Sequence, residues 1–558
     1  MRTKTICLLF AFAAAWAFAD EDPATREHQF FRTYGPSPLF KDNSFVGETV
    51  EDKALPDAEA WKTRVPRAVW DGHPREVAAF ADAWRMVGEK LHKPEKGTNF
   101  KRNYVYTPFG KSVFVWGSCF ITMFGQYASN VFPFICQLDN FYAAQDSDGV
   151  IPRQLGIYDG RSQFERSDLS SIGGNIFAWA ELEWYRYSGD KSRLRRVYPV
   201  LLAYHEWIRR NRTWKDGTYM SSGWGCGMDN IPRFDTKRYS AEFHHGFISW
   251  VDVTFQQIFD AKCLLAIAAA ADLPRDTNLE AEIAALTRLA NERMWNEETG
   301  LYHDLDRDGS PVKARHIGAF WALLAGIAPP DRARRLAAAL EDPATFAAPC
   351  GTRSLAKDYP GYEPDGGNYW RGGVWCITDW MIVRGLDACG LSDAAHRLAL
   401  RHVAAVARVH ADTGTIWESY DPERFAPGKL YGQPVRREFV GFSGVTPIAM
   451  LVRDVFGMDF TPGKVVWKVR LLERHGIENL TLPDGNVVSL ICEQRKSADE
   501  KPVFRVTSTR PLEVVLETCA DASQAADDAR KESLPRLEFG AGLSLADAQG
   551  TLSRLCFL

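Results

Sequence analysis

The sequence predicts a mainly α-helical protein, an (α/α)6 toroid followed by a small antiparallel β domain. Two observations predict this fold. About a dozen segments with a helical hydrophobic period recur from Arg75 to about Phe456, separated by short Gly, Pro or Asp breaks. After residue 461, short stretches that alternate apolar and polar residues follow one another, as β-strands do.

The predicted helices are of two kinds. Segments 280–292 and 331–341 are rich in Ala and Arg with one charged face, as in helices exposed on one side. Segments 174–187 and 373–386 are crowded with Trp, Phe and Ile, as in buried helices. An alternation of about six outer and six inner helices is what a toroid requires. The predicted helices span residues 75–92, 117–129, 132–145, 172–188, 191–211, 248–272, 277–295, 312–326, 331–341, 373–389, 392–410 and 444–456.

The chain divides into four predicted parts. Residues 1–19 combine a charged start, a short apolar run and the small residues of a cleavage site, which predicts a cleavable secretory signal and a secreted or periplasmic protein. This run is too short to span a membrane, and no later uncharged run is long enough. The other parts are an arm wrapped on the toroid (20–70), the toroid as the catalytic domain (71–460) and the β domain (461–558), with strands at 465–472, 487–493, 503–507 and 512–517 and a loop around 520–533.

The composition narrows the class of protein. With 67 basic and 71 acidic residues and 46% hydrophobic residues, the chain is neither collagen-like nor disordered nor a nucleic-acid-coating protein. Its 18 Trp, 18 Tyr and 33 Phe suit either a large core or a groove for a flat ligand such as a sugar, and their number alone favours the core. The 11 cysteines include no C-x-x-C pair, so we expect no zinc site and mostly free thiols.

Three Gly-rich loops concentrate the residues that could carry chemistry, at 221–235, 366–375 and 414–423. Loops on a rigid scaffold are common sites of function. Each loop also has a structural interpretation: a capping aspartate, an arginine paired with a buried carboxylate and a surface acid. The side chains concerned are Trp224, Asp229, Asn230 and Arg233 in the first loop, Tyr369, Trp370, Arg371 and Trp375 in the second, and Trp417, Glu418 and Tyr420 in the third.

These three loops, in this order, resemble the trehalase-like and mannosyl-oligosaccharide-glucosidase-like glycoside hydrolases, especially the mannosylglycerate-hydrolase-like subgroup. The matching segments are Gly227–Arg233, Tyr369–Trp375 and Trp417–Pro422. Asp148–Arg153 looks like an early loop of the family, and Phe439–Gly444, which contains Phe442, looks like the segment before its last inner helix. The likeness spans about 70–470 and implies the same toroid.

The resemblance implies hydrolysis of an α-glycosidic bond with inversion. Asp229 would protonate the leaving oxygen, and Glu418 would deprotonate a water on the opposite face of the sugar. Arg153 and Arg371 would bind hydroxyl or anionic groups. The remaining substrate-binding residues would be Trp224, Asn230, Arg233, Tyr369, Trp370, Trp375, Trp417, Tyr420 and Phe442. This chemistry needs neither a metal nor an organic cofactor, and its partner is an oligosaccharide or another glycoside.

One position departs from the family pattern. Where the family has an Asp that binds hydroxyls of the reacting sugar, this chain has Gly117, after Phe114-Val115-Trp116. A site built for a hydroxyl rejects analogues that lack it, so loss of the carboxylate implies a different sugar or a substituent in the vacated space. The sequence therefore assigns no particular sugar.

Two other functions remain open on the sequence alone. One is a polysaccharide lyase on the same toroid, with Tyr239, His244 or His245 as the base. The other is a catalytically silent glycan-binding protein, since Gly117 replaces the family Asp. An unsaturated product that absorbs in the ultraviolet would identify the lyase, and binding without turnover would identify the binding protein.

Overall fold

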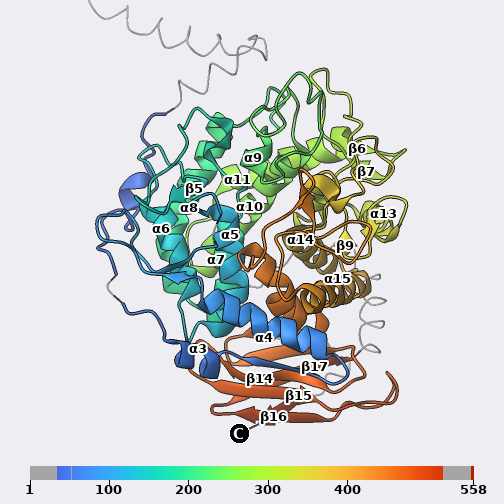
Figure 1. Ribbon diagram of the computed structural model, residues 1–558. Coiled ribbons are helices and arrows are strands. Elements are labelled where there is room, and N and C mark those ends of the chain that lie inside the picture. Colours follow the sequence, from blue (N-terminus) through green and yellow to red (C-terminus); the bar gives the residue numbers. More distant parts are fainter. Residues whose placement is uncertain (1–33, 52, 108, 519–553, 558) are drawn as a thin grey trace, which may run out of the picture.

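The computed structural model describes residues 34–51, 53–107, 109–518 and 554–557. The predicted signal at 1–19, the first part of the arm and the loop around 520–533 lie outside the described residues. Helices form the larger body of the molecule in Figure 1, and most of the strands lie together beneath it.

The helices follow the predicted segments closely in most places. The long outer helix predicted at 191–211 has these bounds, and the others are shifted or shortened by a few residues. They are α3 (Ala58–Arg64), α4 (Pro74–Gly88), α5 (Val115–Gly125), α6 (Asp139–Ala143), α7 (Phe177–Ser188), α8 (Lys191–Asn211), α9 (Gly223–Cys226), α10 (Val251–Ala270), α11 (Thr277–Leu289), α12 (Trp321–Leu324), α13 (Pro330–Glu341), α14 (Cys376–Ala388) and α15 (Ser392–Thr413). Shorter or wider helical turns are η2 (Phe40–Asp42), η3 (Gln126–Ala128), η4 (Phe134–Leu138), η5 (Leu169–Ser171), η6 (Ala290–Met294), η7 (Ile317–Phe320), η8 (Gly366–Asn368), η9 (Phe442–Val445) and η10 (Thr446–Val455).

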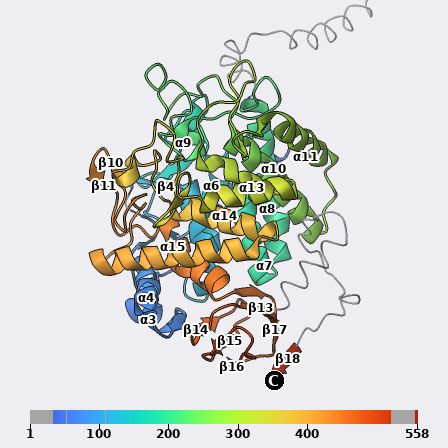
Figure 2. The same ribbon diagram turned by 90° about the vertical axis from the view of Figure 1, so that its right-hand side faces the viewer.

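The inner helices close into a ring. In chain order they are α5, α7, α10, α12, α14 and η10; each packs against the next, and η10 packs against α5. The outer helices α4, α6, α8, α11, α13 and α15 alternate with them along the chain. Figures 1 and 2 show this ring from two sides. The arrangement is that of an α/α toroid, in agreement with the prediction.

Burial separates the two kinds of helix as their sequences predict. The outer helix α13 buries only Ala333, Leu336 and Leu340, one stripe of an amphipathic helix. The inner helix α10 is buried on almost all sides, including the Asp260 that bonds His205 of α8. Among the described residues, α10 is also the one helix long and apolar enough to cross a membrane, and 67% of its most apolar window is buried inside the protein.

The predicted helix 312–326 is only partly correct. Residues 312–316 are extended, and helical structure begins at Ile317 in η7 and continues in α12. His316 stops the helix from starting earlier, because its backbone is extended and its ring Nδ1 accepts a hydrogen bond from the Gly318 N–H. The helical period in this segment was therefore correct while its N-terminal boundary was wrong.

The strands form two four-stranded sheets, which lie beneath the ring, and several short hairpins within the helical body. The sheets have the strand orders β1-β14-β15-β16 and β12-β13-β17-β18. Their strands are β1 (Arg67–Trp70), β14 (His475–Thr481), β15 (Val487–Cys492), β16 (Phe504–Ser508), β12 (Met458–Thr461), β13 (Lys464–Val469), β17 (Leu512–Thr518) and β18 (Arg554–Phe557). The hairpins pair β2 (Leu91–His92) with β3 (Tyr104–Val105), β4 (Ser112–Phe114) with β5 (Gln154–Gly156), β6 (Trp295–Asn296) with β7 (Leu301–Tyr302), β8 (Ala347–Ala348) with β9 (Gly351–Thr352), and β10 (Lys429–Leu430) with β11 (Gln433–Pro434).

Three features of the sheets differ from the prediction. Strand β1 comes from the predicted arm, and its Ala68 pairs with Ile477 of β14, so the arm ends inside a sheet. Strands β12, β14 and β18 were not predicted; the burial of β14 does not alternate regularly, and its pairing shifts by a bulge after Ile477. Strands β13 and β17 pair in parallel, so an all-antiparallel arrangement is wrong for this pair. The alternation of apolar and polar residues along one segment does not tell which distant strand the segment pairs with.

Candidate active site

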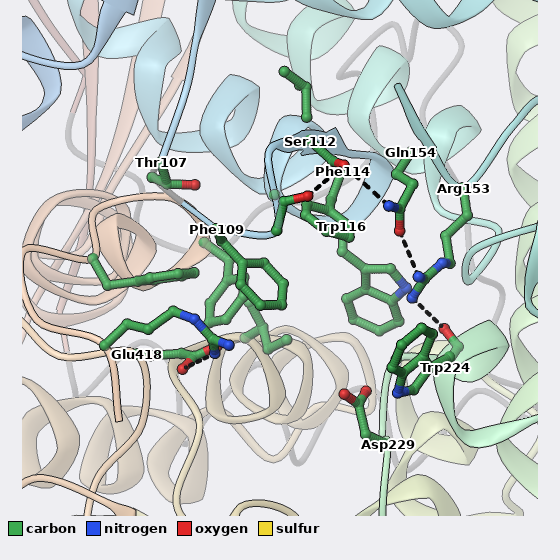
Figure 3. Close-up of a pocket in the computed structure, with 18 of the residues that line it drawn as sticks. Thr107, Phe109, Ser112, Phe114, Trp116, Arg153, Gln154, Trp224, Asp229 and Glu418 are labelled. Carbon is green, nitrogen blue, oxygen red and sulfur yellow. Dashed lines mark hydrogen bonds and ion pairs between the residues drawn. The ribbon is translucent and has the colours of Figure 1, made fainter. Parts of the chain in front are cut away.

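A cavity of about 540 Å³ opens into the toroid between the loops of its inner helices. It brings together residues that are far apart in the chain, and Figure 3 shows part of its wall. Nine of the predicted site residues line it: Asp229, Glu418, Arg153, Trp224, Asn230, Tyr369, Trp370, Trp375 and Phe442.

Asp229 stands on a tight turn whose glycines have specific steric roles. Helix α9 ends at Gly227, which adopts the left-handed conformation with φ of 82° and packs on the indole of Trp116. A Cβ on Gly223 would lie 2.0 Å from the carbonyl oxygen of Asp229. Larger residues would therefore displace the carboxylate, so these glycines set its position.

Asn230 joins the first loop to the second. Its Nδ2 donates to the carbonyl oxygen of Asn368 at 3.0 Å, and its Oδ1 accepts from the N–H of Trp370 at 2.9 Å. The second loop reaches this position through two non-glycine residues with positive φ, Asn368 at 34° and Tyr369 at 69°. Such backbone strain persists only where surrounding contacts fix it. Here Trp370 stacks on Trp375 at 4.0 Å between ring centroids.

Glu418 is only 1% exposed and is held on one side of the cavity. The hydroxyl of Tyr369 donates to its Oε1 at 2.9 Å. Nη1 of Arg436 lies 2.8 Å from Oε1 and 2.7 Å from Oε2, and its guanidinium stacks on the ring of Phe109 at 3.8 Å. Burial raises the pKa of Glu418, and the cation and these hydrogen bonds partly offset that rise.

Asp229 lies across the cavity from Glu418 (Figure 3). Its pKa is raised to about 7, chiefly by loss of hydration; the positive charge of Arg153 opposes this rise, and the negative charges of Glu418 and Glu242 add to it. Within the described residues, its carboxylate makes no hydrogen bond and no ion pair. Of the two carboxyl groups predicted for the chemistry, the pKa of Asp229 is thus raised toward neutral pH, and Glu418 is held by an arginine.

Arg153 is the second cation of the cavity. Its guanidinium is surrounded by the rings of Phe114, Phe164 and Trp224, with centroids at 5.6, 4.8 and 5.1 Å. Its Nη1 donates to the carbonyl oxygen of Trp224, and its Nη2 to Gln154, as Figure 3 shows. Burial lowers the pKa of this guanidinium to about 10, so it remains charged at neutral pH.

Gly117 also lines the cavity, at the start of α5. A Cβ built on it would meet no atom within 4 Å. The wall is therefore open at this position, and the glycine is not required by close packing.

The structure places three predicted residues outside the cavity wall. Arg371 does not line the cavity; its Nε donates to the carbonyl oxygen of Gly361 at 3.2 Å, while Trp370, in the same turn, lines the wall and stacks on Trp375. Trp417, which precedes Glu418, also lies outside the wall, and its Nε1 donates to the hydroxyl of Thr413. Tyr420 is fully buried, and its ring packs against His402.

Arg233 is likewise absent from the wall and belongs to a buried charge cluster. Its guanidinium contacts Asp252 at 2.6 Å and Asp304 at 3.0 Å, and lies 4.1 Å from the ring centroid of Trp250. His316 contacts the second carboxylate at 3.0 Å. The cluster anchors the end of the Asp229 loop to the toroid, which is a structural role and corrects the predicted contact with substrate.

Replacing Arg233 by methionine should lower the free energy of unfolding by about 3–5 kcal/mol, because it leaves buried carboxylates without their cation. The matched variant Arg371→Met, on a partly exposed side chain, should cost about 1 kcal/mol or less. Urea titration followed by circular dichroism measures both. Equal losses in the two variants would show that the cluster does not anchor the fold.

Sequence reasoning missed several wall residues, of which Arg436 matters most. It is 18 residues from Glu418 in the chain, and the return through the β10–β11 hairpin brings the two together, with Trp417 paired to Arg437. The signal that could have indicated it is the Tyr431-Gly432 turn between the two segments. Other missed wall residues are Phe109, Ser112, Phe164, Gln154, Gln163 and Glu242.

The bases considered for a lyase do not line the cavity. His244 stacks on Tyr239 at 4.4 Å and on His245 at 4.8 Å, in a loop behind the wall. The Nδ1 atoms of both histidines accept backbone N–H groups, from Gly246 and Phe247. These contacts favour a structural role for the cluster.

Comparison with known proteins identifies one family. A family model described as the mannosylglycerate hydrolase MGH1-like glycoside hydrolase domain matches residues 114–432. This range contains Arg153, Asp229 and Glu418.

Individual proteins that are similar in sequence or structure are consistent with this family match. An uncharacterised protein of Borreliella burgdorferi is 28% identical over 397 residues, covering 68% of this chain and 79% of its own. A mannosylglycerate hydrolase of Thermus thermophilus is 26% identical over 39% of this chain, and the match spans 64% of that enzyme, a little under two thirds. The crystal structure of a family 63 mannosylglycerate hydrolase from another strain of Thermus thermophilus, in complex with glucose, aligns with a TM-score of 0.53 and 21% identity, over 67% of this chain and 99% of that one, which supports the same fold.

Proposed function

Because the chain belongs to the mannosylglycerate hydrolase MGH1-like glycoside hydrolases, we propose that it is an exported, inverting α-glycosidase that cleaves a terminal bond of an oligosaccharide, with Asp229 as general acid and Glu418 as general base. Its reaction is the hydrolysis of a glycosidic bond. The observation that carries the residue assignment is the position of these two carboxyl groups on opposite sides of one cavity (Figure 3).

Asp229 is suited to the acid role by its protonation state. A pKa of about 7 leaves a substantial fraction of the carboxyl protonated at neutral pH, which a general acid requires. Its proton passes to the glycosidic oxygen as the bond to the anomeric carbon breaks, so that the leaving group departs as an alcohol. Arg153, which favours the ionised form through its charge, stabilises the carboxylate that remains.

Glu418 is suited to the base role by its partners. Arg436 and Tyr369 keep its carboxylate oriented toward the cavity, and the positive charge favours its ionised form. It takes one proton from a water whose oxygen attacks the anomeric carbon from the side opposite the leaving group. Solvent then returns a proton from Glu418 to Asp229, which completes the cycle.

This mechanism inverts the anomeric centre, since water attacks directly from the opposite face. Inverting pairs stand roughly 6.5–9.5 Å apart, to leave room for the water between base and sugar. The support for this mechanism is that Asp229 and Glu418 lie on opposite sides of one cavity and that the family resemblance implies inversion. The aromatic wall of Trp370, Trp375 and Phe442 gives the apolar faces of the sugar a surface to pack on.

The open wall at Gly117 affects which sugar the site can accept. With no atom within 4 Å of an added Cβ, the position leaves room for a substituent on the reacting sugar, or for a sugar that does not need a carboxylate there. The names of two relatives are mannosylglycerate hydrolase and probable mannosyl-oligosaccharide glucosidase. We therefore do not propose mannosylglycerate or a glucoside as the substrate of this chain.

Proton NMR of the first product tests the proposal. With α-linked gluco- and manno-oligosaccharides as probes, we expect the β anomer of the released sugar to appear first and to mutarotate later. An α anomer as first product would contradict the inverting mechanism. Release of no sugar from any member of the panel would contradict the assigned activity.

We also propose the cellular location and the division of the chain from its sequence. The segment 1–19 has the composition of a cleavable secretory signal, which supports export. The helical body at 71–460 would be the catalytic domain and 461–558 the β domain, with the arm at 20–70 contributing β1 to the latter. Mass spectrometry of the secreted protein should find an N-terminus at Asp20.

A further inference from the structure

Two aromatic rings stand exposed beside the cavity, where burial does not explain them. The side chain of Tyr431 is 76% exposed and lines the cavity. The side chain of Phe243 is 50% exposed, and its ring centroid lies 4.6 Å from that of Trp224, a wall residue. Large apolar side chains gain stability by leaving water, so neither ring contributes its full share to folding.

The backbone at Tyr431 makes that side chain still less favourable for folding. Tyr431 and Gly432 are the two central residues of the β10–β11 hairpin, with φ of 50° and 76°. A two-residue turn with both φ values positive favours Asn, Asp or Gly at its first position. A tyrosine there carries a left-handed strain of about 1 kcal/mol. The turn therefore presents this ring at a cost to the fold, as strained functional positions do.

Both rings are attached to the loop that carries Asp229. The N–H of Trp224 donates to the carbonyl oxygen of Glu242 at 3.0 Å, which fixes Phe243 against the loop. On the other side, Asn230 bonds the carbonyl oxygen of Asn368, whose Oδ1 accepts the N–H of Tyr431 at 3.1 Å. These contacts connect the segments that carry both rings to the loop that carries the assigned acid.

A general acid protonates the leaving group, so its surroundings are the leaving-group side of the site. We propose that Tyr431 and Phe243 form leaving-group subsites that stack on the second and third sugars of an α-linked oligosaccharide. The inference rests on the proposed function, because it takes Asp229 as the acid. The occupant is a sugar chain because the rings continue the aromatic wall of the catalytic cavity, and an exposed ring can pack on the apolar face of a sugar.

The subsites predict how activity depends on chain length. In the wild type, kcat/KM should rise from di- to tetrasaccharide. Tyr431→Asn and Phe243→Ala should each lower kcat/KM for a tetrasaccharide by roughly fivefold to tenfold, the range of one aromatic contact. Both variants should hydrolyse α-glucosyl or α-mannosyl fluoride at the wild-type rate, since fluoride occupies no leaving-group subsite.

Two variants separate this effect from stability. Asparagine suits the first position of the turn, so Tyr431→Asn should retain or raise the Tm while it loses activity on long substrates. Phe425→Ala removes another exposed ring, 39% accessible and outside the cavity wall, and should change neither activity. An equal loss on fluoride and tetrasaccharide would overturn the inference, because the rings would then act on the reacting sugar.

The result also distinguishes this inference from the proposed function. If the wild type hydrolyses the fluorides with inversion but gains nothing from two to four sugars, the subsites are wrong and the glycosidase stands. If no probe is hydrolysed, the proposed function fails; calorimetric titration with maltotetraose and mannotetraose then decides the subsites. Binding that weakens in Tyr431→Asn supports them, and absence of binding overturns them.

Discussion

Replacing Asp229 by asparagine is expected to lower kcat on an oligosaccharide by roughly 10²–10⁴-fold, the usual contribution of a positioned proton donor. The amide has the size of the carboxyl group and the carboxylate has no bonded partner among the described residues, so the fold should be unaffected. Asp235→Asn, at an exposed carboxylate of the same loop, is the matched control and should keep full activity.

The nature of the leaving group identifies the role. A glycosyl fluoride leaves without a proton, so Asp229→Asn should lose far less activity on α-glucosyl or α-mannosyl fluoride than on an oligosaccharide. The ratio of the two losses measures proton donation alone. Equal losses on both substrates would remove Asp229 as the acid and would point to a role in binding.

The pH profile gives a second test of the same residue. The acid must be protonated, so wild-type kcat/KM should fall above about pH 7, and this alkaline limb should disappear in Asp229→Asn. The pKa of Asp229 is raised in the folded protein, so the neutral carboxyl group contributes to the free energy of unfolding at low pH. This contribution is lost as the pH rises through about 7. The asparagine variant should therefore have an equal or higher Tm than the wild type at pH 8. A lower Tm at that pH would contradict a carboxyl group whose pKa is raised by folding.

Replacing Glu418 by glutamine is expected to cause a loss of similar size, with a different pattern. Activation of water is needed whatever the leaving group, so activity on the oligosaccharide and on the fluoride should fall together, by roughly 10²–10⁴-fold. Glu438→Gln, at an exposed residue of the segment that returns past Glu418, is the control and should be active.

An external nucleophile provides a positive result for the base. In Glu418→Ala, azide needs no deprotonation and can occupy the vacated space beside Arg436 and Tyr369. We expect azide to restore turnover of the α-glycosyl fluoride and to yield a β-glycosyl azide, identified by NMR. An α-linked azide, or full activity of Glu418→Gln without azide, would contradict the assignment. Thermal denaturation checks that the unpaired Arg436 does not unfold the variant.

Local sequence rules predicted much of the fold. The period of apolar residues gave the helices of the ring, and the difference between one charged stripe and all-round burial separated outer α13 from inner α10. The rules failed where the partner is distant. Strand β1 belongs to a sheet whose other strands come near the end of the chain, as its pairing of Ala68 with Ile477 shows.

The candidate site also has a part that the sequence predicted and a part that it did not. The three Gly-rich loops were visible because glycines, aromatic rings and charged groups gather within a few residues of Asp229, Tyr369 and Glu418. Which side chain of each loop enters the cavity was not visible. Trp370 lines the cavity and Arg371 does not, because Trp370 stacks on Trp375 while Arg371 bonds the carbonyl oxygen of Gly361 in a neighbouring segment.

The sequence by itself predicted the helical ring and the three loops, because these depend on residue type and local spacing, and its family resemblance supplied the two acids proposed for the chemistry. Only the tertiary structure decided the environment of each acid. It paired Glu418 with Arg436, placed Asp229 in the cavity wall with a raised pKa, and assigned Arg233 to a structural cluster. Charge interactions and loss of hydration depend on distances across the closed ring, and no local pattern records those distances.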